Sequence, residues 1–457
     1  MIRKPIVRYL IILALLTLII QNVLAQDTHY WNLQYGTRST LLGGAVIGSV
    51  SDMAATYYNP AALALFPAPE ILLSGKVYQY NSLSLNNGAG PGKDLTSSAI
   101  ETAPTLFAGS FTFDWLGDNT LSYSILTRQQ MNFGIEGRRG GTRESNTGQD
   151  LVAGELIANQ ELSDLWIGLT WSKKLNDHIA IGVTPYFSVR DQKTRKHAYS
   201  ELLNGAGDVS ASILTQQFEY KNYRLLAKAG FGAIFDPLTL GITITTPTLS
   251  LGGSGSSLVN LVDSGAASDE ATVFIANFQQ DVTARHHLPL SVGFGTGYQL
   301  GRHRLHFSAE WFDKINQYDI LDTQEFTAQS NGETYQNRVD SELKSVFNYG
   351  IGAEFYAGEN LDLFISYVTD FSAAKDGTRT NLTVSTWDIY HLSGGASFAI
   401  GRSEFTLGIN YAFGKGKAKG QVNLPEGDIK NALADLFEDT DLDYKRFKFL
   451  IGFSIEI

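Results

Sequence analysis

The feature that most constrains the fold is an alternation of apolar with small or polar side chains that recurs along most of the chain. Side chains of a β-strand point to opposite faces in turn, so this alternation gives each strand one apolar face. It is clearest between residues 404 and 413, where the apolar positions are Phe405, Leu407, Ile409, Tyr411 and Phe413. The pattern predicts an all-β fold.

The alternation divides the chain into about fourteen strands, which are joined by two kinds of connection. Tight turns such as 117–119 and 401–403 carry the glycine, asparagine or aspartate that hairpins favour, and they alternate with much longer loops. This order and an even strand count are typical of an antiparallel transmembrane β-barrel, whereas a soluble sandwich would explain only the alternation. The predicted strands are 71–85, 105–116, 120–136, 162–175, 179–198, 217–235, 239–251, 287–300, 303–319, 344–357, 361–372, 387–400, 404–417 and 444–457.

The beginning of the chain has the features of a cleaved secretory signal. Three basic residues precede an apolar run from 9 to 20, and a small-residue cleavage site follows at Ala25. We therefore expect residues 1–25 to be a signal peptide. Its loss changes the formal net charge from −11 to −14, because it removes Arg3, Lys4 and Arg8. A chain this acidic is not expected to bind nucleic acid, and the absence of cysteine excludes disulfides and thiolate metal sites.

Residues 26–70 precede the first predicted strand and do not alternate. They contain Gly43-Gly44 and then Asn59-Pro60, where asparagine suits a helix N-cap and proline suits the first helical position. Short helices broken by glycine turns are therefore predicted. A barrel of about fourteen strands encloses a lumen, and we expect this apolar segment to fill it as a plug, with the barrel spanning 71–457.

At these residues the chain resembles the FadL-type outer-membrane transporters of long-chain fatty acids and other hydrophobic compounds. Residues 35–45 and 54–63 are similar to the hatch segment of that family. The hatch motif positions are Gly43, Gly44, Asn59, Pro60 and Ala61. One departure is Ile457, where an aromatic last residue is usual in such barrels.

The resemblance implies passive uptake in the outer membrane of a Gram-negative type of cell. In this family an apolar groove among the extracellular loops collects the compound, an interior site lies near the hatch, and the compound leaves sideways through the wall. The implied partners are a hydrophobic small molecule such as a fatty acid, outer-membrane lipids and the barrel assembly machinery. No cofactor, metal or enzymatic activity is implied.

Two predicted extracellular loops carry more apolar residues than is usual for surface loops, which indicates a docking groove for the ligand. The alternative is that these side chains only pack the loops together. The candidate residues are Leu202, Leu203, Leu258, Leu261, Phe274 and Phe278.

Counting along the strands turns four cations toward the lumen: Arg128, Arg190, Arg224 and Lys228. Arg190 and Arg224 lie at similar height on adjacent predicted strands, so they are candidates to bind a carboxylate through charge-assisted hydrogen bonds. The alternative is that these charges are solvated or paired with plug residues.

On the strand predicted at 120–136, Thr127 and Gln129 interrupt an otherwise apolar lipid face. Polar groups facing hydrocarbon are costly, so a kink or bulge that turns them away and opens the wall would explain them. They are our candidate lateral gate. The alternative is that the strand leaves the membrane early.

A second class of function, from another branch of FadL-like barrels, is a protein-binding shuttle subunit of a type IX secretion system. An apolar stripe at helical spacing in the last long loop would dock the partner, namely Ile429, Leu433, Leu436 and Phe437. Enzymatic alternatives have less support. His303 and His306, for example, lie three apart on a predicted strand and so face opposite sides.

Overall fold

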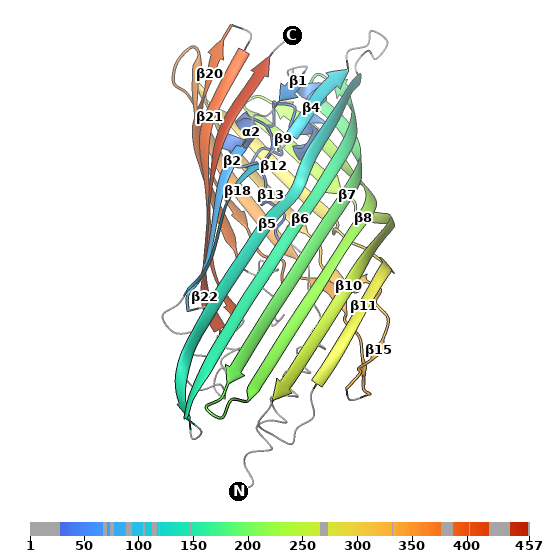
Figure 1. The fold of residues 1–457 in the computed structure, drawn as a ribbon. Coiled ribbons are helices and arrows are strands. Elements are labelled where there is room, and N and C mark those ends of the chain that lie inside the picture. Colours follow the sequence, from blue (N-terminus) through green and yellow to red (C-terminus); the bar gives the residue numbers. More distant parts are fainter. Residues whose placement is uncertain are drawn as a thin grey trace.

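The structure is a computed structural model, and its antiparallel strands form a closed ring (Figure 1). It describes residues 28–66, 71–73, 77–87, 94–103, 106–111, 117, 119–145, 148–265, 273–330, 332–375, 387–401, 403–419 and 439–455. The predicted signal peptide lies outside these residues. No helix in the described ranges is both long and apolar enough to cross a membrane.

In the described chain, each strand of the ring pairs with the next, and the pairing returns to its start after fourteen positions, some of which are shared by two short strands. The ring closes where β22 pairs with β21 on one side and with β1 and β2 on the other. The prediction of about fourteen strands is therefore confirmed. The positions are held by β1 (Ile71–Leu73) with β2 (Val77–Leu85), β3 (Leu95–Ala103) with β4 (Leu106–Phe111), β5 (Asn119–Ser145), β6 (Gly148–Asn176), β7 (Ile179–Leu203), β8 (Val209–Phe235), β9 (Leu238–Thr245) with β10 (Leu249–Gly265), β11 (Val273–Thr283) with β12 (Ser291–Leu300), β13 (His303–Phe312), β18 (Val346–Tyr356), β19 (Leu361–Asp370), β20 (Ile389–Ile400), β21 (Ser403–Lys419) and β22 (Asp439–Ile455).

The alternation read from the sequence corresponds to the two faces of this ring. On β6, Ile167, Leu169 and Trp171 point outward and are 44%, 49% and 38% exposed, whereas Trp166 and Thr170 point inward and are buried. An apolar outer face is what the hydrocarbon of a bilayer requires. The ring is therefore a transmembrane barrel with a packed interior.

The strands β5 to β8 are 25 to 29 residues long, although about 9–11 residues suffice to cross a membrane (Figure 1). The prediction of long loops at 137–161 and 199–216 is therefore wrong, because these residues continue the hairpins. Their outer face is polar: Arg138 lies opposite Glu155, and Glu161 and Glu201 are exposed. Polar side chains on this face hide the alternation while the backbone pairing continues.

We call this extension the outer wall. It comprises 130–145 of β5, 148–163 of β6, 191–203 of β7, 209–221 of β8, 254–265 of β10, and β11.

Two small sheets pack against the inner face of the outer wall, and neither belongs to the ring. They are β14 (Ile315–Leu321) paired with β17 (Val339–Leu343), and β15 (Phe326–Thr327) paired with β16 (Thr334–Tyr335). The strand predicted at 303–319 is thus wrong in its second half, since β13 ends at Phe312. Ile320 and Leu321 of β14 pack instead on Phe218 and Tyr220 of β8.

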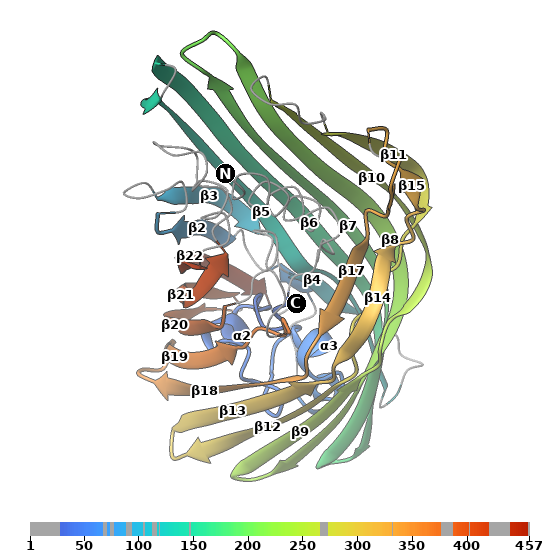
Figure 2. The ribbon, with the colours of Figure 1, turned by 90° about the horizontal axis from the view of Figure 1, so that it is seen from below.

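Residues 28–66 lie inside the ring, and we call them the luminal segment (Figure 2). Their helices have one turn each: α2 (Arg38–Leu41), α3 (Ala55–Tyr58) and α4 (Ala62–Leu65). Tyr35, Leu42 and Met53 are fully buried, and they form one apolar cluster with wall residues that include Trp166 and Phe364. The segment is therefore part of the core of the protein.

Candidate functional site in the barrel lumen

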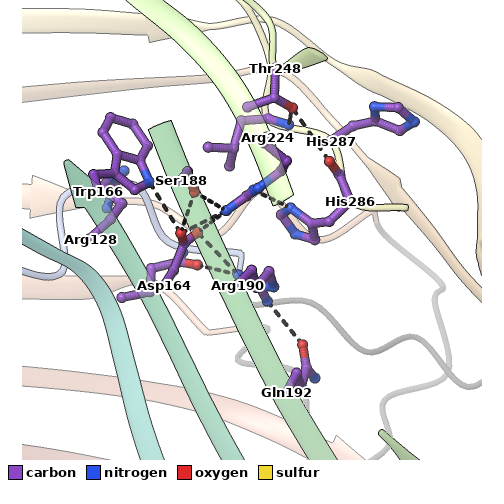
Figure 3. Close-up of polar contacts among 12 residues, drawn as sticks. Arg128, Asp164, Trp166, Ser188, Arg190, Gln192, Arg224, Thr248, His286 and His287 are labelled. Atoms are coloured by element: carbon purple, nitrogen blue, oxygen red, sulfur yellow. Dashed lines mark hydrogen bonds and ion pairs between the residues drawn. The ribbon is translucent and has the colours of Figure 1, made fainter. Parts of the chain in front are cut away.

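Three charged side chains meet on the inner face of neighbouring strands: Asp164 on β6, Arg190 on β7 and Arg224 on β8 (Figure 3). The register explains why, because Asp164 lies opposite Arg190, and Arg224 lies opposite Ser188. Arg224 Nη2 is 2.6 Å from both carboxylate oxygens of Asp164, and Arg190 Nη1 is 3.7 Å from Oδ2. All three side chains are fully buried, and the Asp164 carboxylate compensates one of the two positive charges, so the trio keeps a net charge of +1.

Further hydrogen bonds hold Asp164 and Arg190 in place. Ser188 Oγ and Trp166 Nε1 donate to Asp164 Oδ1 at 2.8 and 3.1 Å. Arg190 in turn donates to three neighbours, which are Tyr220 Oη at 2.9 Å, Gln129 Oε1 at 2.7 Å and Gln192 Oε1 at 3.0 Å. Asp164 therefore occupies the place between the two arginines that a ligand carboxylate would need.

The sequence predicted that Arg190 and Arg224 face the lumen at similar height, and the structure brings them together. It did not identify Asp164, which is a residue of the wall and not of the plug. A signal is present in the sequence, because the apolar residues Leu165, Ile167 and Leu169 alternate along the predicted strand 162–175 and so place Asp164 on the opposite face. The role of the two arginines as head-group contacts stays a prediction.

Arg128 and Lys228, the other two predicted cations, face the luminal segment. Arg128 Nη2 donates to Tyr30 O at 2.6 Å. Lys228 Nζ lies 4.5 Å from the centre of the Tyr57 ring, in cation–π contact. Beside it is a cavity of about 20 Å³, lined by Lys228, Glu310 and aromatic residues of the segment. Since one water needs about 10–15 Å³, this space fits a water molecule and not an amphiphile.

The Asn-Pro-Ala motif of the luminal segment sits on wall positions that have no side chain. A Cβ atom at Gly230 would overlap Asn59 Oδ1, and one at Gly182 would overlap the backbone of Pro60. The prediction that Asn59 is a helix N-cap is wrong, since α4 begins only at Ala62. Its side-chain amide instead donates to two carbonyl oxygens, Ile47 O at 2.9 Å and Phe231 O at 3.0 Å, and so links the segment to β8.

The glycine pair and Asp52 determine the turns inside the luminal segment. Gly43 and Gly44 have φ angles of +63° and +79°, a region that disfavours other residues. The Asp52 carboxylate accepts hydrogen bonds from Ser39 N at 3.2 Å and Ala54 N at 3.1 Å, which joins two turns. Burial raises the pKa of the Asp52 carboxyl above its ordinary value.

Hydrogen bonds and one ion pair connect the luminal segment to strands all around the ring, and we call them the tethers. They are Tyr35 to Thr127 on β5, Thr56 to Tyr186 on β7, Asn59 to Phe231 on β8, Ser49 to His306 on β13, Arg38 to Glu354 on β18, Leu41 to Ser366 on β19, and Asn32 to Arg446 on β22. The segment is therefore fixed on every side of the lumen.

The wall is irregular at the predicted gate. The register between β5 and β6 shifts between Thr127 and Gln129, so Arg128 is an extra, bulged residue. Placing Gln129 on the lipid face is therefore wrong: one extra residue exchanges the two faces, and Gln129 points inward with 3% of its surface exposed. Thr127 is partly buried, and its carbonyl oxygen accepts a hydrogen bond of 3.1 Å from Tyr35 Oη.

On its other edge β5 loses its partner at the same height. Its ladder with β4 ends at the pair Leu106–Leu126, and no strand of the described chain pairs with that edge beyond Leu126. We call residues 126–129 the wall break. Both neighbours of β5 thus change at the level where Tyr35, Tyr30 and His29 of the luminal segment form hydrogen bonds with this strand.

The apolar residues predicted to form a docking groove do not form one. Leu258 lies opposite Phe278 on the outer face of the outer wall, with Phe274 four residues away on the same face. Leu261 lies opposite Ile275 on the inner face. The prediction of a single groove is wrong, because Leu258 and Leu261 are three residues apart on one strand and so point to opposite faces. Leu202 and Leu203 pair with Val152 and Leu151 at the far end of the outer wall.

The remaining candidates are the apolar stripe of the last long loop and the histidines. The stripe at Ile429, Leu433, Leu436 and Phe437 lies outside the described residues. His306 is buried beside Ser49, whereas His303 is exposed, as expected for opposite faces. Within the described ranges no group of three or more histidine, aspartate or glutamate side chains could hold a metal ion.

A closed barrel with an N-terminal segment folded into its lumen defines the class of plugged transmembrane barrels. No protein-family model and no curated protein sequence matches the chain. Solved structures do match it. A FadL homologue from Pseudomonas aeruginosa has 15% sequence identity and a TM-score of 0.57, over 95% of this chain and 99% of that one.

Two further structures show the same likeness. The toluene transporter TodX of Pseudomonas putida has 12% identity and a TM-score of 0.56, over 93% of this chain and 99% of TodX. The toluene transporter TbuX of Ralstonia pickettii has 12% identity and a TM-score of 0.52, over 93% and 100%. The chain therefore has the FadL-type fold, and the resemblance predicted from sequence is confirmed for the fold.

Proposed function

We propose that the protein is an outer-membrane channel for the uptake of hydrophobic compounds by passive diffusion. The support is a FadL-type fold with an apolar outer face, together with similar structures described as toluene transporters and a FadL homologue. Residues 1–25 would be removed during export, and residues 26–70 would act as the plug.

The observation that carries the proposal is the wall break in β5. There the ladder with β4 ends, the ladder with β6 shifts by one residue, and Tyr35 of the luminal segment covers the inner side. A compound that leaves the lumen here enters the bilayer directly. An apolar molecule thereby avoids transfer into water, which is the costly step.

The cluster around Asp164 bears on the class of compound. A fatty acid would need Arg190 and Arg224 to bind its carboxylate, but Asp164 already occupies the position between them. We therefore favour a neutral hydrophobic compound, recognised by apolar contact, over a long-chain fatty acid. Passage also requires the luminal segment to move, since the cavity of about 20 Å³ beside Lys228 is too small for either compound.

The test is to close the wall break by a disulfide. A cysteine at Thr127 would be joined to one at position 105, the residue that precedes the last described pair of β4. As a control, cysteines at Phe107 and Ile125, which already face each other across the ladder, would be joined in the same way. Uptake of labelled toluene into cells should stop in the first variant when it is oxidised and recover on reduction, and the control should transport normally.

Uptake that persists through the cross-linked wall would show that compounds do not leave at this place. Labelled oleate, measured in parallel, separates the two classes of compound. Uptake of oleate without toluene would contradict our preference for a neutral compound, and uptake of neither would contradict the channel itself.

A further inference from the structure

The last strand of the outer wall, β11, has one edge that forms no ladder within the described ranges. β11 pairs with β10 from Ser254–Thr283 to Asp263–Val273. On its other side, Ser330 N donates to Phe274 O at 3.2 Å and Asp322 N donates to Thr283 O at 3.0 Å, so backbone contacts are made near the two ends of the strand. Figure 1 shows β11 at the end of the long strands, beside β15. An open strand edge carries backbone N–H and C=O groups that can pair with another chain, so its surroundings determine what can bind there.

Part of this edge is covered by glutamine side chains in place of a strand. The Gln329 amide donates to Ala276 O at 2.8 Å and accepts from Ala276 N at 2.9 Å. Similarly, the Gln279 amide donates to Gln324 O at 2.8 Å and accepts from Gln324 N at 2.8 Å. Because a side-chain amide lies between them at both points, the backbone of residues 324–329 is farther from the backbone of β11 than a paired strand would be. This leaves space between the two segments.

The edge remains open around Phe278. Both backbone groups of Ala276 point away from β10, and in an antiparallel ladder the residue two positions along points the same way. Phe278 N–H and C=O therefore face the open edge, and in the described chain they have no partner there. Beyond Phe278 the β10–β11 ladder is irregular: its register shifts between Gly255 and Ser257, and Asp281 has a φ angle of +54°. Pairing with β10 resumes at Val282 and Thr283.

The space beside this edge is an open pocket of about 520 Å³ with an acidic lining. Asn277 and residues 279–283 of β11 form one side, and Asp322, Gln324 and Glu325 form the other. Asp281, Asp322 and Glu325 are exposed, and no lysine or arginine lines the pocket. None of the three carboxylates forms an ion pair within the described residues, so their negative charge is available to a partner.

We propose that the edge of β11 from Phe278 to Asp281 binds an extended, lysine- or arginine-bearing segment of another polypeptide, which adds as a strand. Main-chain pairing at Phe278 supplies the direction and register of the added strand. Basic side chains of the partner meet Asp281, Asp322 and Glu325, which steer its approach and select for positive charge. A second copy of this chain does not fit, because edge-to-edge pairing would bring two sets of these carboxylates together.

The test uses the full-length protein in detergent micelles and a fluorescent peptide of alternating lysine and valine. Two further peptides are controls: one of alternating glutamate and valine, and a lysine–valine peptide with N-methylated backbone amides. Only the unmodified lysine–valine peptide should bind, and its affinity should fall as salt is raised, because the contacts are partly ionic. Equal binding of the N-methylated peptide would exclude strand addition, and no binding of the unmodified peptide would refute the proposal.

Two variants locate the binding. Phe278→Pro removes the N–H at the open edge while the residues that face β10 keep theirs, and Phe278→Ala is the control that keeps this N–H. Neutralisation by Asp281→Asn, Asp322→Asn and Glu325→Gln removes the charge without touching the backbone. Each should weaken binding by about tenfold, the ratio expected for loss of one or two such interactions. If neutralisation and Phe278→Pro both leave the affinity unchanged, the peptide binds elsewhere and the proposal is wrong.

Discussion

Arg38 of the luminal segment and Glu354 of β18 form an ion pair inside the barrel, with 11% and 2% of their side-chain surfaces exposed. Arg38 Nε donates to Glu354 Oε1 at 2.8 Å, and Nη2 donates to the other oxygen, so the contact is bidentate. A charged pair taken out of water stabilises a fold only while both partners are present. This pair therefore makes the position of the luminal segment depend on one glutamate of the wall.

Replacement of that glutamate should destabilise the barrel. In Glu354→Gln the Arg38 guanidinium stays buried without a counter-charge, for which the expected cost is about 3–5 kcal/mol. Heat-dependent migration on gels should show unfolding at a lower temperature. The double variant Arg38→Met/Glu354→Leu removes both charges and should recover much of the loss. If the single variant is as stable as the unmodified protein, the pair does not hold the segment.

Removal of Asp164 should create a carboxylate site. In Asp164→Ala the side chain between Arg190 and Arg224 is absent, so a fatty acid could supply the missing negative charge. Mass spectrometry of the purified variant should detect retained fatty acid, whereas the unmodified protein should retain none. Asp177→Asn, an exposed change in the turn after β6, is the control. Fatty acid bound equally to all three proteins would contradict the role assigned to Asp164.

A side chain at Gly230 should push the luminal segment out of place. In Gly230→Val the new atoms would occupy the position of Asn59 Oδ1 and press on Pro60. Single-channel recordings in planar bilayers should show a higher conductance. Gly141→Val is a matched control, because a Cβ there meets nothing within 4 Å. Equal conductance in both variants would mean that the segment does not close the lumen at this point.

Deletion of residues 26–65 should have a larger effect of the same kind. It removes the segment that fills the ring, so conductance should rise above that of Gly230→Val. It also removes the tethers, so the variant should unfold at a lower temperature. A deletion protein that conducts no better than the intact one would show that the segment is not a plug.

The membrane-crossing part of the fold could be predicted because the bilayer imposes a strict pattern on it. Ile167, Leu169 and Trp171 face lipid, and no polar residue is tolerated among them, so alternation marks the strand. The outer wall faces water on its outer side. Polar residues such as Arg138, Glu155 and Glu201 therefore replace the apolar residues there, and composition no longer distinguishes a strand from a loop.

The candidate site was predicted only in part, because it depends on pairing and register. Facing directions could be counted for Arg190 and Arg224, but their partner Asp164 is known only once β6, β7 and β8 are aligned. The bulge at Arg128 has no signature in composition. It reverses the expected direction of Gln129, and it was inferred only as one way to explain polar residues on a lipid face.

The tethers brace the barrel wall from inside. A barrel with an empty lumen deforms easily under lateral pressure, whereas one that is connected on many sides to a central segment keeps its cross-section. Displacement of the whole segment would break the tethers to β7, β8, β13, β18, β19 and β22 together. A rotation of the Tyr35 side chain alone would break only its own hydrogen bonds to β5, because Asn32 and Arg38 on either side stay bound to β22 and β18. The least costly deformation of this barrel is thus a local one at the wall break, while the rest of the ring keeps its shape.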